Sequence, residues 1–362
     1  MHARGLGGVN VPALRSHNAA LVLDLLRTAG ETGISRLELA ERTGLTPQAV
    51  SKITARLRAE GLAAEAGHRA STGGKPRTVL RLVPSAGYAV GVHLDRDELT
   101  TLLTDLAGTV VASRRRPVDL GAGAEPVLDA VTEEVRALLA DGPGDAPAPA
   151  PVVGVGLAMP GPLDHRAGVP GRVTGFPSWD GYPVRDELAR RLGLAVVLDK
   201  DTNAAALGLA LRPAAPGSFA YVHLGTGLGA GLVLGGAPLR GDRTGAGELG
   251  HQTVQLDGPP CDCGGRGCLE VLCLAAVARG ELAEAARILG AGAANLVRLL
   301  DIDQVLLGGR VVLGAPEVFA DGVREVLAGL GLPTPVAVAT DPRAVAVAGG
   351  AAWLVLAPIF GQ

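Results

Sequence analysis

The sequence predicts an α/β protein in which a winged helix-turn-helix precedes a larger body of alternating strands and helices that carries a metal cluster. Three observations lead to this fold class. Capped short helices and a basic loop fall within residues 1–84. Short apolar strands then alternate with amphipathic helices, as in α/β proteins. One histidine and three cysteines, finally, fall within residues 251–268.

The composition fits a globular protein with a basic N-terminal block. The 362 residues are 48% hydrophobic but only 2% aromatic, so alanine, valine and leucine must build the cores. The net charge of −3 is uneven, because residues 1–80 hold 11 lysines and arginines against 6 acidic residues, whereas the remainder holds 22 against 30. This distribution indicates that only the first block meets a polyanion. No signal peptide or bilayer-length apolar run is present, so we expect a cytoplasmic protein.

Three helices are expected in the N-terminal block. The first covers residues 18–29, where apolar residues recur at helical spacing. The segment Ser35-Arg-Leu-Glu38 is a capping box that opens a second, short helix. Thr46 provides an N-cap, and Pro47 the first helical position, of a third helix. Two short helices around a glycine-containing turn define a helix-turn-helix unit.

The third helix and the loop that follows carry the residues expected to contact DNA. Gln48, Ser51 and Lys52 project from the first turns of this helix, where a recognition helix meets base edges. Two strand-like runs, 62–66 and 78–83, enclose a loop with cations and no carboxylate, which is typical of a wing. Its expected phosphate contacts are Arg69, Lys75 and Arg77. The alternative is a small dimerisation domain with a solvated basic loop, but the caps, turn, polar face and wing together favour DNA binding.

The rest of the chain has the pattern of an α/β body. Strands are expected at residues 88–94, 99–105, 109–115, 152–158, 195–198 and 219–224, and helices at residues 127–139, 185–192 and 202–211. A proline-rich connector at residues 141–151 is stiff and exposed and offers no chemistry. This alternation favours a mostly parallel sheet covered by helices, with ligands bound at the carboxyl ends of the strands.

Three local signals mark a candidate ligand cleft. Asp201 lies at a strand-to-helix junction, where a carboxylate can accept a hydroxyl proton or a sugar hydrogen bond, although a helix N-cap explains it equally well. The glycines of residues 225–229 would let the backbone approach a phosphate, but a glycine hairpin is an equal alternative. Glu248 precedes His251 by three residues, and a metal-bound His251 would keep its second nitrogen free for a ligand.

The most informative motif is His251-x9-Cys261-x-Cys263-x4-Cys268, with three glycines between the cysteines. Four soft donors that leave no open position fit a closed, tetrahedral, structural zinc site. A disulfide, or cysteines that meet by chance, are the alternatives. Since the chain otherwise has the pattern of an intracellular protein, where disulfides are rare, zinc is favoured. The remaining Cys273 lies in an apolar run and is expected to be a small buried hydrophobe.

Together these segments resemble the ROK family, which contains bacterial sugar-responsive repressors and sugar kinases. The resemblance covers nearly the whole chain, through Ser71-Thr-Gly-Gly-Lys-Pro76, Gly154-Val-Gly-Leu-Ala-Met-Pro-Gly-Pro162, Asp199-Lys-Asp-Thr-Asn203, Leu224-Gly-Thr-Gly-Leu-Gly-Ala-Gly231, Glu248-Leu-Gly-His251 and Cys261-Asp-Cys-Gly-Gly-Arg-Gly-Cys-Leu-Glu270. It implies two ribonuclease-H-like, actin-like lobes that close on a sugar beside a structural zinc. The family's sugar contacts map onto Asp201, Glu248, His251 and Glu270, and its zinc ligands onto His251, Cys261, Cys263 and Cys268.

The resemblance also suggests where the domains begin and end. We expect the winged helix-turn-helix at residues 1–84, the first lobe at residues 85–203 and the second lobe, with the zinc site, at residues 204–362. The last helix of the chain is expected to pack back on the first lobe.

Three departures from the family pattern bear on function. Kinases of the family carry an Asp-x-Gly-Gly-Thr turn that holds ATP phosphates, and here Asp95, Arg96 and Asp97 replace its two glycines and its threonine. Like charges about 4 Å apart cost on the order of 1–4 kcal/mol, so phosphate affinity should largely vanish. Lys200 stands where the family usually has asparagine, which changes the sugar contacts. The segment 270–306 is shorter than usual by several helical turns, which bears on oligomerisation.

The sequence therefore predicts a sugar-responsive transcriptional regulator, a repressor and not an enzyme. A homodimer or homotetramer would bind double-stranded operator DNA at half-sites about one turn apart, and a sugar between the lobes would change operator affinity. One alternative is an ATP-dependent sugar kinase that also binds DNA, with Asp201 as the general base. Another is a regulator that responds to a protein partner and not to a sugar.

Overall fold

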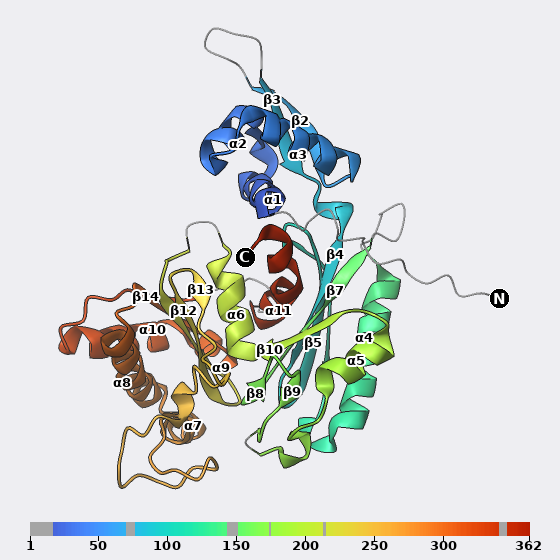
Figure 1. Cartoon of the computed structure of the whole chain (residues 1–362). Helices are drawn as coiled ribbons and strands as arrows, with labels where there is room; N and C mark the ends of the chain where they lie inside the picture. The colour runs from blue at the N-terminus through green and yellow to red at the C-terminus, as the bar shows by residue number, and fades with distance from the viewer. Residues whose placement is uncertain (1–16, 70–76, 143–150, 174, 213–214, 340–345) are drawn as a thin grey trace.

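The computed structural model describes residues 17–69, 77–142, 151–173, 175–212, 215–339 and 346–362. A small N-terminal domain lies at one end of a two-lobed α/β body (Figure 1). The predicted fold class is confirmed, because a winged helix-turn-helix precedes a ribonuclease-H-like body. Within the described ranges, no helix has both the length and the apolar character that a membrane span requires.

The N-terminal domain follows the predicted helix caps. Its elements are α1 (His17–Ala29), β1 (Ile34–Ser35), α2 (Arg36–Thr43), α3 (Pro47–Ala59), β2 (Ala63–Arg69) and β3 (Arg77–Leu82). The Ser35 hydroxyl accepts a hydrogen bond from the Glu38 N–H, and the Glu38 carboxylate accepts one from the Ser35 N–H, so the capping box is present. The Thr46 hydroxyl caps α3 through the Ala49 N–H. The short strand β1 was not predicted, and it completes a three-stranded sheet of order β1-β3-β2.

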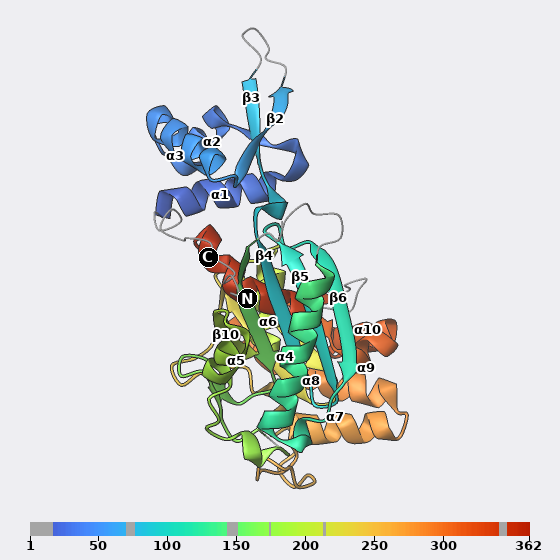
Figure 2. The ribbon, with the colours of Figure 1, turned by 90° about the vertical axis from the view of Figure 1, so that its right-hand side faces the viewer.

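The first lobe is built on a five-stranded sheet of order β10-β7-β4-β5-β6. Its elements are β4 (Tyr88–Leu94), β5 (Glu98–Asp105), β6 (Val110–Pro117), α4 (Ala124–Asp141), β7 (Val152–Met159), β8 (Leu163–Asp164), β9 (Val169–Pro170), α5 (Val184–Leu192) and β10 (Val196–Lys200). Helices α4 and α5 cover one face of this sheet (Figure 2). Valines and leucines of the strands and of both helices form the core between them.

The second lobe repeats the topology of the first, with strand order β13-β12-β11-β14-β15. Its elements are α6 (Asp201–Ala210), β11 (Phe219–Leu224), β12 (Leu228–Leu234), β13 (Ala237–Pro238), the 3-10 turn η6 (Leu249–His251), α7 (Leu269–Ala278), α8 (Leu282–Leu300), β14 (Gln304–Gly308), α9 (Arg310–Gly314), α10 (Pro316–Gly329), β15 (Val336–Val338), α11 (Ala346–Leu356) and the 3-10 turn η7 (Ala357–Phe360). In each lobe three antiparallel strands precede two parallel ones. Both sheets are therefore mixed, whereas a mostly parallel sheet was expected.

Helices α6 and α11 lie side by side between the two sheets (Figure 1). Helix α11 packs on β4 and β7 of the first lobe, and α6 packs on β11 and β12 of the second. Glycines make these contacts close: a Cβ at Gly156 would lie 1.7 Å from the Ala351 oxygen of α11, and one at Gly350 would lie 1.9 Å from the Ala204 oxygen of α6. Since neither position has room for a larger side chain, α11 packs backbone against backbone on β7 at Gly156 and on α6 at Gly350.

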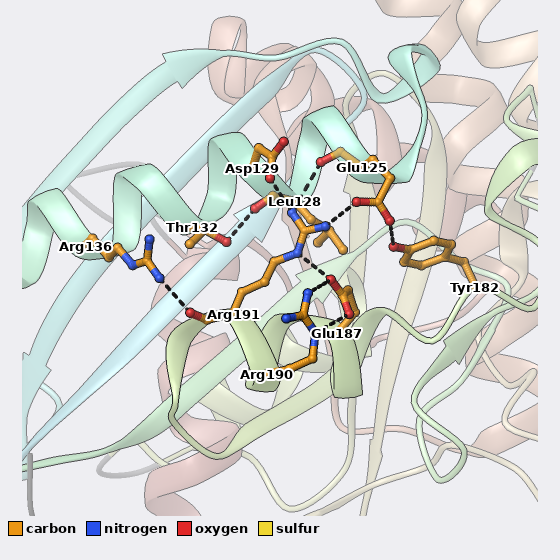
Figure 3. A network of polar contacts seen from close by, with 9 residues as sticks. All are labelled: Glu125, Leu128, Asp129, Thr132, Arg136, Tyr182, Glu187, Arg190 and Arg191. Carbon is orange, nitrogen blue, oxygen red and sulfur yellow. Dashed lines mark hydrogen bonds and ion pairs between the residues drawn. The ribbon is translucent and has the colours of Figure 1, made fainter. Parts of the chain in front are cut away.

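A network of ion pairs fixes α5 to α4 (Figure 3). Arg191 of α5 pairs with Glu125 and Asp129 of α4, and also with Glu187 one turn earlier on α5. Hydrogen bonds from Arg190 and Arg191 lower the pKa of Glu187 to about 2. The network thereby positions α5, which precedes the strand that leads into the cleft between the lobes.

Candidate functional site

A polar cleft lies between the lobes, at the carboxyl ends of several strands. Its walls include Asp95 after β4, Gly161 after β7, Asp201 after β10 and Gly227 after β11. This is the edge at which α/β sheets bind their ligands. The structure also brings the four expected sugar contacts to this cleft, and these are Asp201, Glu248, His251 and Glu270.

Asp201 is the first residue of α6, and the N-cap position belongs to Lys200, whose side chain makes no capping bond. One Asp201 carboxylate oxygen accepts a hydrogen bond from the Thr202 N–H at 2.6 Å. Burial raises the pKa of Asp201 to about 7, against the opposing effect of the Lys200 ammonium. A carboxyl group with this pKa can accept a proton or a hydroxyl hydrogen bond near neutral pH.

Lys200, at the end of β10, lines the cleft. Its ammonium lies 2.9 Å from the Glu248 carboxylate and donates to the Ala246 carbonyl at 3.0 Å. The side chain is only 6% exposed, so these partners are needed to hold the charge. The ion pair connects β10 of the first lobe to the second-lobe loop that precedes His251.

Glu270, in the first turn of α7, joins this helix to the glycine hairpin between β11 and β12. Its Oε2 accepts a hydrogen bond from the Leu228 N–H at 2.7 Å. The Gly225 N–H donates to the Gly227 carbonyl at 2.9 Å, so residues 225–229 form the hairpin that sequence reasoning gave as an alternative. A Cβ at Gly227 would lie 3.0 Å from Glu270 Oε2, which shows how closely the acid approaches the hairpin.

The turn of residues 95–97, between β4 and β5, touches the second lobe directly. Asp95 accepts a hydrogen bond from the Thr226 hydroxyl at 2.9 Å. Asp97 accepts two hydrogen bonds from Arg310, each at 2.9 Å. Sequence reasoning did not identify Thr226 or Arg310, because nothing local to them indicates a partner in the other lobe. Arg96, from the same turn, lines the cleft.

The cysteines and the histidine gather between η6 and α7. Their ligand atoms all lie within 4.8 Å of one another, for His251, Cys261, Cys263 and Cys268. The Cys263 and Cys268 sulfurs are 3.7 Å apart, and Cys261 Sγ lies 3.7 Å from His251 Nδ1. A tetrahedron with metal–sulfur bonds of about 2.3 Å has edges of about 3.8 Å, so the donor set fits a tetrahedrally coordinated metal ion. All four cysteines of the chain are free thiols, and Cys273 is buried as expected.

His251 belongs to both the cluster and the cleft. Its Nδ1 faces the cysteines, so Nε2 is the nitrogen available to the cleft. The loop reaches this geometry through Gly267, which has a φ of 57° and whose added Cβ would lie 1.7 Å from the Gln255 oxygen. Only glycine fits there. His251 therefore joins the Cys3His cluster to one wall of the cleft.

The winged helix-turn-helix presents the expected recognition face to solvent. Gln48, Ser51 and Lys52 of α3 are all exposed, and Arg56, which sequence reasoning missed, lies one turn beyond Lys52 and is exposed too. At the wing, strands β2 and β3 are paired as far as Arg69, which lies opposite Arg77. Lys75 lies outside the described residues. The structure thus places the three helix residues on one accessible surface.

The fold and its two sites define a class of protein in which a winged helix-turn-helix is joined to a two-lobed body with a polar cleft and a Cys3His cluster. A winged helix-turn-helix DNA-binding model matches residues 23–63. The ROK family model matches residues 89–280, more than half of the chain. The chain belongs to the ROK family.

Relatives include both repressors and kinases. The xylose repressor of Bacillus subtilis (strain 168) is 30% identical over 240 residues, which are 66% of this chain and 61% of that protein. A glucokinase of Thermotoga maritima is 36% identical over 198 residues, which are 54% of this chain and 60% of that protein. The match thus spans about three fifths of the length of these relatives. The crystal structure of a ROK family transcriptional regulator, a homologue of the E. coli MLC protein, covers 95% of this chain and 98% of its own with a TM-score of 0.76 at 22% identity, so it shows the shared fold.

Proposed function

We propose that this protein is a cytoplasmic, sugar-responsive transcriptional repressor. The observation that carries the proposal is the coexistence of an exposed recognition face on α3 with a cleft that gathers hydrogen-bonding side chains from both lobes. A xylose repressor and an N-acetylglucosamine repressor are among the relatives, which supports this function. The effector would be a sugar or a sugar derivative.

The sugar would bind between the lobes. Asp201, Glu248 and Glu270 offer carboxylate oxygens as hydrogen-bond acceptors, and His251 offers its Nε2. These carboxylate acceptors, together with the Nε2–H of His251 as a donor once Nδ1 ligates the metal, suit the hydroxyl groups of a carbohydrate. Closure of the lobes on the sugar would change the position of the DNA-binding domain and hence the operator affinity, by the 5- to 150-fold that is typical of allosteric coupling.

Operator binding would use a homodimer or homotetramer. Gln48, Ser51 and Lys52 would meet base edges in the major groove, and Arg69, Lys75 and Arg77 would contact phosphates from the wing. Two copies would recognise half-sites about one DNA turn apart.

The metal would be a structural zinc ion held by His251, Cys261, Cys263 and Cys268. These four donors leave no open coordination position, so zinc would supply rigidity and no reaction chemistry. Through His251 it would keep the adjoining wall of the cleft in place.

A second candidate is an ATP-dependent sugar kinase, which the pKa of about 7 for Asp201 and the kinase relatives favour. Against it stand the acidic turn and its ties to the second lobe, since ATP phosphates that met this turn, as the resemblance to the family's kinases implies, would be repelled by the carboxylates of Asp95 and Asp97. We therefore propose that the chain is not an enzyme.

One set of measurements tests both candidates. A DNA duplex selected from a random pool by the full chain is titrated with protein, with and without D-xylose, D-glucose or N-acetyl-D-glucosamine, and binding is followed by fluorescence anisotropy. The repressor proposal expects one sugar to change the affinity at least 5-fold. ADP formation from ATP in the presence of these sugars, at enzymatic turnover, would instead establish the kinase.

A further inference from the structure

Among the described residues, two sets of contacts attach the DNA-binding domain to the body. The first is the short linker after β3, where the Pro84 carbonyl accepts a hydrogen bond from the Leu106 N–H, in the turn between β5 and β6 of the first lobe. The second is helix α1, which lies against the C-terminal turn η7 and the end of α6 (Figure 1). The second attachment includes the end of α6, so a movement of α6 relative to the first lobe would act on the domain through this contact.

Arg27 makes the second attachment. Its guanidinium carbon lies 5.0 Å from the centre of the Trp353 ring of α11 and 5.3 Å from that of Phe360 in η7, which are cation–π contacts. It also donates a hydrogen bond to the Leu211 carbonyl at 3.4 Å. The Asp24 carboxylate, one turn earlier on α1, lies 2.7 Å from the Arg27 guanidinium and orients it. The side chain is only 8% exposed although it crosses between two domains.

Leu211 is the C-cap of α6, and this gives Arg27 a physical connection to the cleft. The helix begins at Asp201, whose carboxyl group lines the cleft, and runs for ten residues. It is about 15 Å long, and its C-terminal end carries the negative end of the helix dipole, which favours a nearby cation. Most of α6 is buried between α11 and the second sheet, so we expect it to move as a rigid rod.

We propose that Arg27 is the positioning residue through which α6 transmits the state of the cleft to the DNA-binding domain. This inference rests on the proposed function, because it assigns the route by which a sugar changes operator affinity. A sugar that engages Asp201 shifts the first turn of α6. The Leu211 carbonyl at the other end moves with it and draws Arg27, while the Pro84 linker stays on the first lobe.

The test uses two methionine variants of the full chain. Arg27→Met keeps the apolar stem of the side chain and removes the guanidinium. Arg58→Met is the matched control, because Arg58 pairs with Glu65 at 3.1 Å inside the DNA-binding domain and is 42% exposed. DNA affinity is measured with and without D-xylose, D-glucose or N-acetyl-D-glucosamine, on the selected duplex. The ratio of the two dissociation constants is the coupling factor.

We expect Arg27→Met to bind sugar within about 2-fold of the wild type, as measured by calorimetry, while its coupling factor falls from the typical 5- to 150-fold to nearly 1. Arg58→Met should keep the wild-type coupling factor even if its DNA affinity changes. A variant without Arg27 that retains the full coupling factor overturns the proposal.

A second measurement decides the case in which Arg27→Met no longer binds DNA. The chain has two tryptophans, and labelling with 5-fluorotryptophan gives Trp353 and Trp179 separate fluorine resonances. In the wild type, sugar should shift the Trp353 resonance and leave that of the buried Trp179 unchanged, and the shift should be lost in Arg27→Met. Sugar binding that leaves the Trp353 resonance in place overturns the proposal. If the wild type binds none of the sugars, the proposed function itself fails.

Discussion

Replacement of Asp201 by asparagine should stabilise the protein and at the same time weaken its response to sugar. The carboxyl group has an ordinary pKa of 3.8 and a folded-state pKa of about 7, because burial disfavours the charged form. Asparagine has nearly the same shape and carries no charge. The substitution therefore isolates the cost of holding a carboxylate in the cleft.

The magnitude follows from the two pKa values. A rise from 3.8 to about 7 corresponds to about 4 kcal/mol of stability. The folded state binds the proton more tightly, so this stability is fully present below pH 3.8 and is lost as the pH rises through about 7. The amide leaves polar groups partly unpaired, which costs about 1 kcal/mol. We expect Asp201→Asn to be about 3 kcal/mol more stable than the wild type at pH 8 and equal or slightly less stable at pH 4.

Urea unfolding followed by circular dichroism between pH 4 and pH 8 measures this difference. Asp186→Asn serves as the control, because the Asp186 side chain is 68% exposed and its replacement should change the unfolding free energy by less than about 0.5 kcal/mol. Calorimetry with the sugar that changes DNA affinity should show binding at least 10-fold weaker in Asp201→Asn, since a hydrogen bond to a charged acceptor is lost. If Asp201→Asn were no more stable than the wild type at pH 8, or gained as much stability at pH 4 as at pH 8, the reasoning would be refuted.

Three further substitutions test other parts of the molecule. Cys263→Ser should release the metal, as metal analysis would measure, and lower the melting temperature by about 5 °C or more in calorimetry. It should also abolish the effect of sugar on DNA affinity, measured by anisotropy, because His251 would lose its fixed position. Unchanged sugar binding would contradict the link between metal and cleft. Hydrogen bonds, chiefly the one from Arg190, lower the pKa of Glu187 from 4.5 to about 2. The Glu187 carboxylate therefore stabilises the fold above pH 4.5, and this stability is lost as the pH falls through about 2. Glu187→Gln should therefore lower the unfolding free energy at pH 7, with the loss largely gone at pH 2, and an equal loss at both would exclude the charge as its cause. Lys75→Ala should weaken binding to all DNA sequences about equally and reduce the slope of affinity against salt by about 1, whereas a sequence-selective loss would mean that the wing contacts bases.

Features that depend on neighbouring residues could be predicted from the sequence. Ser35 and Glu38 form their capping box, and Thr46 caps α3, because each contact spans only three residues. The limits of the strand at residues 88–94 agree with the structure because its apolar run is bounded on both sides. The Cys3His cluster could be predicted in the same way, since residues 251–268 contain all four candidate ligands.

Contacts between the lobes could not be predicted in the same way. The pairs of Lys200 with Glu248 and of Asp97 with Arg310 join residues far apart in the chain, and their positions depend on how the lobes close. The mixed character of the sheets, by contrast, could have been predicted, because the sequence contains a short turn that indicates it. The turn at residues 95–97 is too short for the crossover that parallel strands require, so its strands had to be antiparallel.

The place of α11 has a consequence for synthesis on the ribosome. This helix covers β4 and β7 and lies between the lobes, yet it follows in sequence every sheet that it touches. A nascent chain that already contains the first lobe still exposes the apolar face that the helix will cover, including Gly156. Because Arg27 packs on Trp353, this contact between the DNA-binding domain and the body can form only after α11 has been synthesised. Until then the uncovered apolar face makes an incomplete chain prone to aggregate.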